Sequence, residues 1–429
     1  MIQQQLRQLL PEPEVASSAA LSLLCGSAVA MVVWKWLGER QIQQKMEEAQ
    51  RTREEGVKKM AKAVRQFREQ VPSVQTDAIL SLPLLELAGR LQEGSLSPRT
   101  VLYTYIEKAL EVTQQTNCVR HFIPECEEQL QEIQGQKEKG LLYGIPVSIK
   151  DHIGHEGQLS TCGLVQYLGT PEQEDSVLVK VLKRQGAIPF AKTNVPQSLF
   201  NYDCSNTIFG QTLNPLNHQK TPGGSSGGEG ALIAGGGSIL GIGSDVGGSI
   251  RLPSSFCGLC GLKPTAKRLR DVDSLALCMK ALLCEEMFRL DPTLPPIPFN
   301  EEVYSSSAPL RVGYYDTDGY FPLPPCMRRA VRETREALQA AGHKVSTTTP
   351  HSSPRGVPSF ETLGFLRKGK QLLWHDPLLL SSLSTGNIVD PSLKPQVTCY
   401  KIPRLAKKLL ALILKPLVSS WPQAQSTVV

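Results

Sequence analysis

The residues best suited to chemistry lie in one glycine-rich stretch, Thr221 to Pro253, which reads TPGGSSGGEGALIAGGGSILGIGSDVGGSIRLP. A glycine inside a helix or strand costs roughly 0.5–1 kcal/mol relative to alanine, so stability does not account for so many of them. Without Cβ atoms, backbone N–H groups can approach a reacting oxygen closely and adopt positive φ. Ser225 and Ser249, each preceded by a glycine pair, are therefore candidate catalytic residues.

Two nucleotide-binding interpretations of this stretch fail on its residues. A phosphate-binding loop needs a lysine and a hydroxyl after its last glycine, but Glu229, Gly230 and Ala231 stand there, and a carboxylate would repel phosphate. The dinucleotide pattern GxGxxG fails because Val246 occupies the place of its third glycine. A structural turn with ordinary serines remains open, and so does the site of a serine hydrolase.

The hydrolase interpretation depends on the residues before Ser249, which read Asp-Val-Gly-Gly. Backbone N–H groups there can converge on an oxyanion, because two of the residues have no Cβ. The pattern G-x-S-x-G is absent, which argues against the triad of the α/β-hydrolases. His152 and His155 stand three apart with no further cluster, and Cys257 and Cys260 form a single pair, so we expect no metal site.

Two β-α-β patterns supply elements that could position these residues. Over 141–150 the alternation places Val147 and Ile149 on one face of a strand, with Ser148 and Lys150 on the other, so Lys150 stands at a strand end. Such units favour a sheet with parallel members covered by helices. The first predicted unit comprises a strand over 141–150, a helix over 176–183 and a strand over 187–191, and the second a strand over 310–315, a helix over 327–341 and a strand over 344–348. Earlier helices are expected over 81–90 and 97–112.

Composition excludes several classes of function. The chain has 429 residues and a net charge of +6 from 46 basic and 40 acidic residues. No basic run alternates with aromatic residues, so nucleic acid is not an expected partner. The 11 cysteines follow no framework spacing, which favours free thiols in a reducing compartment.

The N-terminal segment predicts a membrane anchor. Residues 15–34 carry no charge, and a span of about 20 apolar residues crosses a bilayer. Lys35, Arg40 and Lys45 follow it, so the positive-inside tendency places the rest of the chain in the cytosol. A signal peptide cleaved after Ala30 and a buried helix are the alternatives.

Beyond this segment the composition changes character three times. Residues 35–74 are dense in charged and amide side chains and predict a solvated helical linker. Residues 75–418 are globular in composition. Within them, 401–417 has a basic amphipathic pattern, which predicts a helix that lies in a membrane interface or packs on the core. Residues 419–429 predict a disordered tail.

The chain resembles the amidase-signature hydrolases, whose pattern combines a strand-end lysine, a GGSSGG loop and a GG-S-aliphatic-R-x-P segment. Lys150, Ser225 and Ser249 fall on the three catalytic positions of that pattern, in order. The resemblance extends from the N-terminal segment to about Leu417 and includes the stretches GLLYGIPVSIKD and GGSSGGEGALI. It implies a Ser-Ser-Lys triad on an α/β fold, with a mixed twisted sheet covered by helices.

The resemblance also implies a role for each residue of the triad. Lys150, desolvated inside the protein, has a lowered pKa and acts as the base. Ser225 follows a cis peptide bond and relays the proton, and Ser249 attacks the substrate carbonyl to give an acyl-enzyme. No cofactor is implied. The positions implied for the oxyanion hole and substrate binding are Leu199, Phe200, Tyr202, Val246, Gly247 and Gly248.

Within the family the similarity is greatest to its membrane-bound branch. That branch implies long-chain primary fatty amides and N-acylethanolamines as substrates, a homodimer, and an endomembrane location. Two departures qualify the match: a segment of the family is skipped near 266–271, and the C-terminal portion of the family is absent after Leu417. Two hypotheses therefore stand, an active lipid amidase and a shortened, catalytically impaired relative that acts through interaction with a partner.

Overall fold

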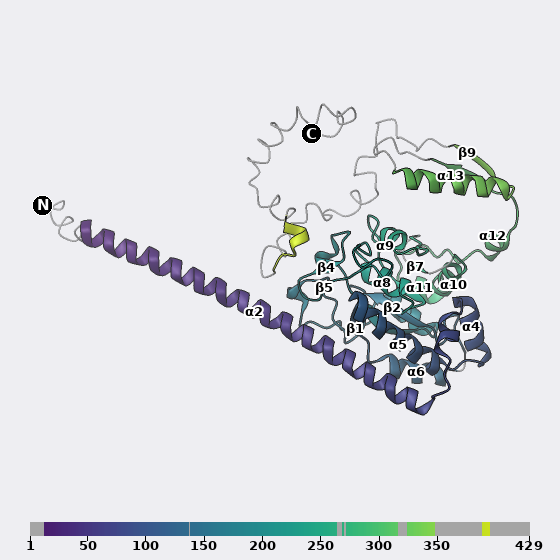
Figure 1. Cartoon of the computed structure of the whole chain (residues 1–429), viewed down its shortest axis with the longest axis horizontal. Helices are drawn as coiled ribbons and strands as arrows, with labels where there is room; N and C mark the ends of the chain where they lie inside the picture. The colour runs from purple at the N-terminus through teal and green to yellow at the C-terminus, as the bar shows by residue number, and fades with distance from the viewer. Residues whose placement is uncertain are drawn as a thin grey trace. The chain divides into compact units, whose positions relative to one another are not determined.

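The computed structural model describes residues 13–136, 138–263, 268–269, 272–315, 324–347 and 388–394, with side chains of the first helix from Gly26 onward. The chain divides into two compact units (Figure 1). One comprises Met1–Pro296 and Leu378–Pro395, and the other Ile297–Pro377 and Gln396–Val429.

The first unit contains a five-stranded sheet in the order β1-β3-β2-β6-β7. The strands are β1 (Val119–Phe122), β2 (Pro146–Lys150), β3 (Ile188–Thr193), β6 (Leu240–Ile242) and β7 (Arg268–Leu269). β2 is parallel to β3 and to β6, whereas the outer strands β1 and β7 are antiparallel to their neighbours. The sheet is therefore mixed. The predicted β-α-β unit is confirmed, because α7 (Val177–Arg184) connects β2 to β3.

The register between β2 and β3 decides which side chains share a face of the sheet. Lys150 is opposite Thr193, and Ile149 is opposite Lys192. Because partners in register point the same way and successive residues alternate, Ser148, Lys150 and Thr193 share one face, and Ile149 and Lys192 the other. All five residues of β2 are buried, so both faces of the strand are covered.

Helices and short elements surround this sheet. The expected helices over 81–90 and 97–112 are confirmed as α4 and α5, and α5 begins with Pro98 directly after Ser97. The helices of this unit are α2 (Pro13–Gln70), α3 (Thr76–Leu80), α4 (Leu84–Glu93), α5 (Pro98–Thr116), α6 (Cys126–Gly135), α8 (Gly227–Ala234), α9 (Arg251–Phe256), α10 (Val272–Leu282) and α11 (Glu285–Leu290). A two-stranded sheet pairs β4 (Ser205–Asn206) with β5 (Gly210–Gln211), and 3-10 turns cover Val165–Tyr167, Gln197–Leu199 and Pro391–Leu393.

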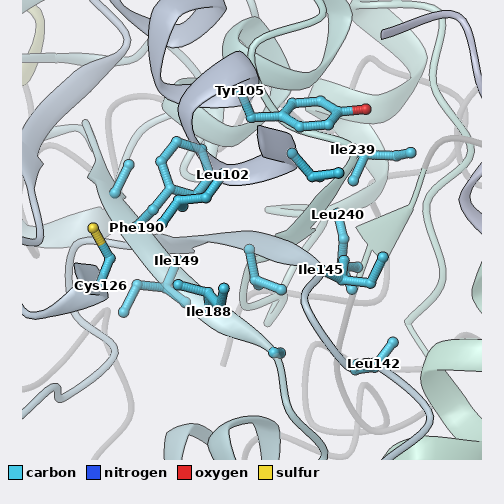
Figure 2. Close-up of a cluster of buried hydrophobic side chains, with 14 of the residues drawn as sticks. Leu102, Tyr105, Cys126, Leu142, Ile145, Ile149, Ile188, Phe190, Ile239 and Leu240 are labelled. Atoms are coloured by element: carbon cyan, nitrogen blue, oxygen red, sulfur yellow. The ribbon is translucent and has the colours of Figure 1, made fainter. Parts of the chain in front are cut away.

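Apolar side chains from the sheet and from α5 form one continuous core. Figure 2 shows Ile149 and Ile188 from the two central strands close to Phe190 and to Leu102 of α5. These residues are fully buried. The core therefore fixes β2 and β3, the strands that carry Lys150 and Thr193.

Helix α2 is more buried than the sequence predicts. It contacts α5 and β1, and it buries Met60, Val64 and Phe67. The Phe67 ring stacks on the Tyr103 ring of α5 with centroids 4.7 Å apart. The linker expected over 35–74 is helical as far as Gln70 but is not wholly solvated, because apolar residues of α2 from Met46 onward pack against the rest of the unit.

The predicted transmembrane helix is not confirmed. Among the helices in the described part of the chain, none combines the length and the apolar character that crossing a bilayer requires.

The second unit contains a smaller β-α-β arrangement. β8 (Arg311–Tyr314) is parallel to β9 (Lys344–Thr347), and α13 (Pro325–Ala340) connects them. A short helix, α12 (Glu301–Ser305), precedes β8. The second predicted β-α-β unit is confirmed. The predictions for 401–417 and 419–429 lie outside the described residues, as does most of 266–271.

Candidate active site

Lys150 ends strand β2 with its side chain fully buried. Its Nζ donates to Ser225 Oγ at 2.7 Å and to Ser244 Oγ at 3.0 Å. Ser244 lies shortly after β6, the neighbouring parallel strand, so two adjacent strand ends meet at this amine. The predicted lysine and the predicted relay serine are therefore in direct contact, although 75 residues separate them in the chain.

The loop that carries Ser225 also holds Ser249. The Gly224–Ser225 peptide bond is cis, as the family resemblance implies. The next residue, Ser226, donates to the Ser249 carbonyl oxygen both from its backbone N–H, at 3.2 Å, and from its Oγ, at 2.6 Å. Ser249 itself is half-buried. The structure thus places Lys150, Ser225 and Ser249 in one site.

Close backbone approach explains the glycine before the relay serine. A Cβ at Gly224 would lie 2.4 Å from the carbonyl oxygen of Asn201. Any larger residue would push away the loop that bears Tyr202. This loop and the Ser225 loop can therefore meet only where a side chain is absent.

Asp245 organises the turn that presents Ser249, and the sequence analysis did not identify it. Its buried carboxylate accepts from the backbone N–H groups of Gly248 (2.7 Å), Ile250 (3.0 Å) and Arg251 (3.1 Å). It also forms a two-pronged pair with the Arg251 guanidinium, with both N···O distances 3.0 Å. Burial by itself would raise the pKa of Asp245, but these hydrogen bonds outweigh it and lower the pKa well below its usual range.

The expected oxyanion hole requires one correction. The Gly248 N–H already donates to Asp245, so it is not available to a substrate oxygen in this conformation. Gly248 has φ of 118°, a conformation that L side chains rarely adopt, which explains the glycine at this position. Within the described part of the chain, the N–H groups of Val246 and Gly247 donate to no other group, and both residues are exposed.

Of the three residues predicted to bind substrate, Tyr202 contacts this turn. Leu199 and Phe200 are half-buried, and Leu199 has a positive φ of 59°. Tyr202 is 54% exposed, and its Oη donates to the Gly247 carbonyl oxygen at 2.8 Å. Tyr202 therefore links the predicted substrate loop to the predicted oxyanion segment.

A second buried charged cluster occupies the other face of the sheet. Asp151 and Arg120 form a buried ion pair at 2.6 Å, and Lys192 Nζ donates to the Ile153 carbonyl oxygen at 2.9 Å. Burial, with help from Arg120, lowers the pKa of Lys192 to about 7. These contacts fix the loop after Lys150. Burial first and then Lys150 lower the pKa of His152 to about 3, so this imidazole is neutral.

No metal centre emerges from the described residues, since none of their His, Cys, Asp and Glu side chains gather in groups of three that could hold an ion.

Comparison with known proteins decides the family. A family model described as "Amidase" matches residues 100–269 and 270–416. The chain belongs to the amidase-signature family. It is a serine amidase with the mixed α/β fold of that family.

Three similar proteins illustrate the relationship. The "Vitamin D3 hydroxylase-associated protein" of Gallus gallus is 59% identical over 437 residues, which covers 96% of this chain and 92% of that protein. The "Fatty-acid amide hydrolase 1" of Sus scrofa is 46% identical over 424 residues, covering 93% of this chain and 71% of that protein. A solved structure titled "Fatty acid amide hydrolase" has a TM-score of 0.61 at 26% identity, covering 72% of this chain and 63% of that one.

Proposed function

We propose that the protein hydrolyses long-chain fatty acid amides, both primary amides and N-acylethanolamines, to a fatty acid and an amine. The observation that carries this proposal is the buried contact of 2.7 Å between Lys150 Nζ and Ser225 Oγ, next to the backbone of Ser249. The similarity to proteins named fatty acid amide hydrolase supports the choice of substrate class.

The proposed mechanism uses these three side chains in sequence. Ser249 Oγ attacks the carbonyl carbon as its proton passes to Ser225 Oγ, which gives its own proton to neutral Lys150. The N–H groups of Val246 and Gly247 stabilise the oxyanion. The relay then protonates the amine nitrogen as the C–N bond breaks, which leaves the acyl group on Ser249 Oγ. Water, deprotonated by the same relay, releases the fatty acid.

The proposed acyl-binding surface lies beside the oxyanion segment. Leu199 and Phe200 offer apolar side chains that are only partly covered, and Tyr202 is held against Gly247 by its hydrogen bond. An acyl chain in contact with these three residues would present its carbonyl to Ser249. A long chain gains about 0.8 kcal/mol for each CH₂ that it buries, which favours long substrates.

Membrane attachment is part of the proposal, because such substrates dissolve in lipid. Between Val29 and Leu37, helix α2 exposes apolar side chains, including Val32, Trp34 and Trp36, which are 68%, 80% and 54% exposed. Apolar surface of this kind marks a membrane or protein contact. We propose a single-pass anchor on an endomembrane, a cytosolic catalytic unit, and a homodimer.

The second hypothesis is a catalytically impaired relative that acts by binding a partner. The chain spans 71% of the porcine relative and 63% of the solved fatty acid amide hydrolase.

One experiment separates the two functions. The full chain, expressed in membranes, is treated with a fluorescent fluorophosphonate beside the Ser249→Ala variant, and hydrolysis of a long-chain primary amide is measured in parallel. Labelling and hydrolysis that both disappear in the variant support the amidase. A wild-type chain with neither Ser249-dependent signal refutes it and favours the binding role.

Carbonate extraction tests the anchor in the same preparation. We expect the chain to stay with the membrane pellet at high pH. Release into the supernatant would contradict a membrane-spanning attachment.

A further inference from the structure

A buried carboxyl group, Glu229, lies beneath the proposed triad and is not used by its mechanism. It is fully buried on α8, the helix that begins directly after the Ser225 loop. Ser148 Oγ donates to one of its oxygens at 2.6 Å, and Thr193 Oγ1 donates to the other at 2.7 Å. Because each oxygen accepts from a hydroxyl, the contacts match an ionised carboxylate, which only accepts hydrogen bonds.

The proton arrangement around Ser148 supports the same assignment. Ser238 Oγ, 3.0 Å from Ser148 Oγ, has its own acceptor in the Leu240 carbonyl oxygen at 2.8 Å. Ser238 therefore uses its single proton there, so Ser148 is the donor toward both Ser238, at 3.0 Å, and Glu229, at 2.6 Å, and the contact with Glu229 is the shorter. The carboxylate receives both hydroxyl protons that face it.

The backbone of the third strand is shaped to admit this carboxylate. Gly241 of β6 is opposite Ser148 in register, and a Cβ there would lie 2.1 Å from the Glu229 Oε2 atom. The side chain thus contacts β2, β3 and β6 together. This is a built site for a charged group and not an accident of packing.

The two hydroxyl donors place Glu229 on the face of the sheet that carries Lys150. Ser148 precedes Lys150 by two residues on β2, and Thr193 is the register partner of Lys150 on β3. Ser148 and Lys150 therefore point to the same side of β2, one repeat of the pleat apart. The Glu229 carboxylate and the Lys150 amine are both fully buried, and charges in such surroundings interact more strongly than charges in water.

We propose that Glu229 is a positioning residue for the amidase reaction: its carboxylate stabilises the protonated form of Lys150 and holds β2, β3 and α8 in the arrangement that brings Lys150 to Ser225. The inference rests on the proposed function. The negative charge of Glu229 sets the pH at which Lys150 becomes a base, because a buried lysine without a counter-charge would lose its proton at lower pH.

Other charged groups near α8 do not take this role. On β3, Lys192 points to the opposite face of the sheet, and β6 has no titratable residue between Leu240 and Ile242. Helix α5 places Val112 and Ala109 against the end of α8. The thiols beside α8 belong to Cys204, whose pKa burial raises to about 12, and to Cys257, and the Arg251 guanidinium of α9 pairs with Asp245.

The test is the pH profile of kcat/KM for a long-chain primary amide, measured on the full chain in membranes. Glu229→Gln keeps the shape and removes the charge, and we expect the acid limb to move to lower pH by about one unit. Thr193→Val removes one hydrogen bond to the carboxylate and is expected to move the limb in the same direction by less. Glu111→Gln, which removes an exposed carboxylate of α5, is the matched control and should leave the profile unchanged.

Each outcome decides something. A residue that only supports the fold would lower the rate equally at all pH values, so a folded Glu229→Gln variant with an unshifted acid limb overturns the inference. If that variant does not fold, an unshifted limb in Thr193→Val overturns it. The pH dependence of fluorophosphonate labelling at Ser249 gives the same readout without amide turnover. A wild-type chain without Ser249-dependent labelling or hydrolysis fails the proposed function itself, and the inference with it.

Discussion

The two β-α-β units of this protein have the same topology and very different burial. In the first, β2-α7-β3, every residue of both strands is buried. In the second, β8-α13-β9, the strands are exposed or half-buried, and no residue of α13 is buried. The comparison shows that a repeating pattern specifies a local arrangement, while burial depends on the layers that other segments add.

The added layers can be named for the first unit. β1 and β6 extend the sheet on either side, and α5 and α8 contact β2. A pair of strands alone is marginally stable in water and needs further strands or a packed helix. Within the described residues the first unit has both, whereas the second has only the helix α13, and the buried polar side chains of the described residues belong to the first unit.

The largest contrast is expected between two lysines on parallel strands. Replacing the buried Lys150 with methionine should lower kcat/KM for a fatty amide by about 10²–10⁴-fold, because the base is lost. Replacing the exposed Lys344 of β9 with methionine should change it less than about twofold. Amide hydrolysis by purified membranes measures kcat/KM for both variants. Equal losses in the two variants would contradict the expected difference between Lys150 and Lys344.

Two matched valines sharpen the comparison in stability. Val147→Ala in β2 removes fully buried methyl groups and should lower the free energy of unfolding by about 2 kcal/mol. Val345→Ala in β9, which is half-buried, should cost about 0.5 kcal/mol. Urea unfolding followed by circular dichroism gives both values. Similar costs at the two positions would show that the second unit is as well packed as the first.

The carboxylate of Asp245 makes the stability of the first unit depend on pH. Its folded-state pKa is below the unfolded value near 4, so its stabilisation is present above about pH 4 and is lost as the pH falls through the folded value. Asp245→Asn should therefore cost about 1 kcal/mol at pH 7, and the gap to the wild type should narrow below pH 4. Urea midpoints at several pH values test this, and a gap that does not change with pH would contradict it.

The smallest effect on stability is expected from a substitution on the surface of the second unit. Arg329 and Glu333 form an exposed pair at 3.4 Å on one face of α13. Exposed pairs of this spacing contribute about 0.3–0.5 kcal/mol, so Arg329→Gln should barely move the melting temperature. A thermal melt of the full chain checks it, and a shift of several degrees would reveal a packing role for this face.

The sequence predicted what local pattern and motif determine. Alternation identified β2 and its faces, and helical spacing identified α5, α7 and α13. The motif match selected Lys150, Ser225 and Ser249, which the fold brings together. The structure leaves their catalytic roles as a proposal.

The features that were missed depend on contacts between distant residues. Glu229 served only as an argument against a phosphate loop, because its partner Ser148 lies 81 residues away. Asp245 belonged to the turn before Ser249, but nothing local shows that its carboxylate would occupy the Gly248 N–H. The burial of α2 was different, since Val57, Met60, Val64 and Phe67 form a helical stripe that the dense charge around it concealed.

Helix α2 also fixes the distance between its exposed apolar segment and its packed segment. It runs without interruption from the exposed Trp34 to Met46, the first residue that it buries in the catalytic unit, which is a distance of about 18 Å. A flexible tether would let the two ends turn independently, whereas a helix fixes both their separation and their rotation. Each residue inserted between Trp34 and Met46 would turn one end by about 100° relative to the other. Whatever surface holds the apolar segment therefore also decides the orientation of the packed part of α2 and of the strand β1 that it contacts.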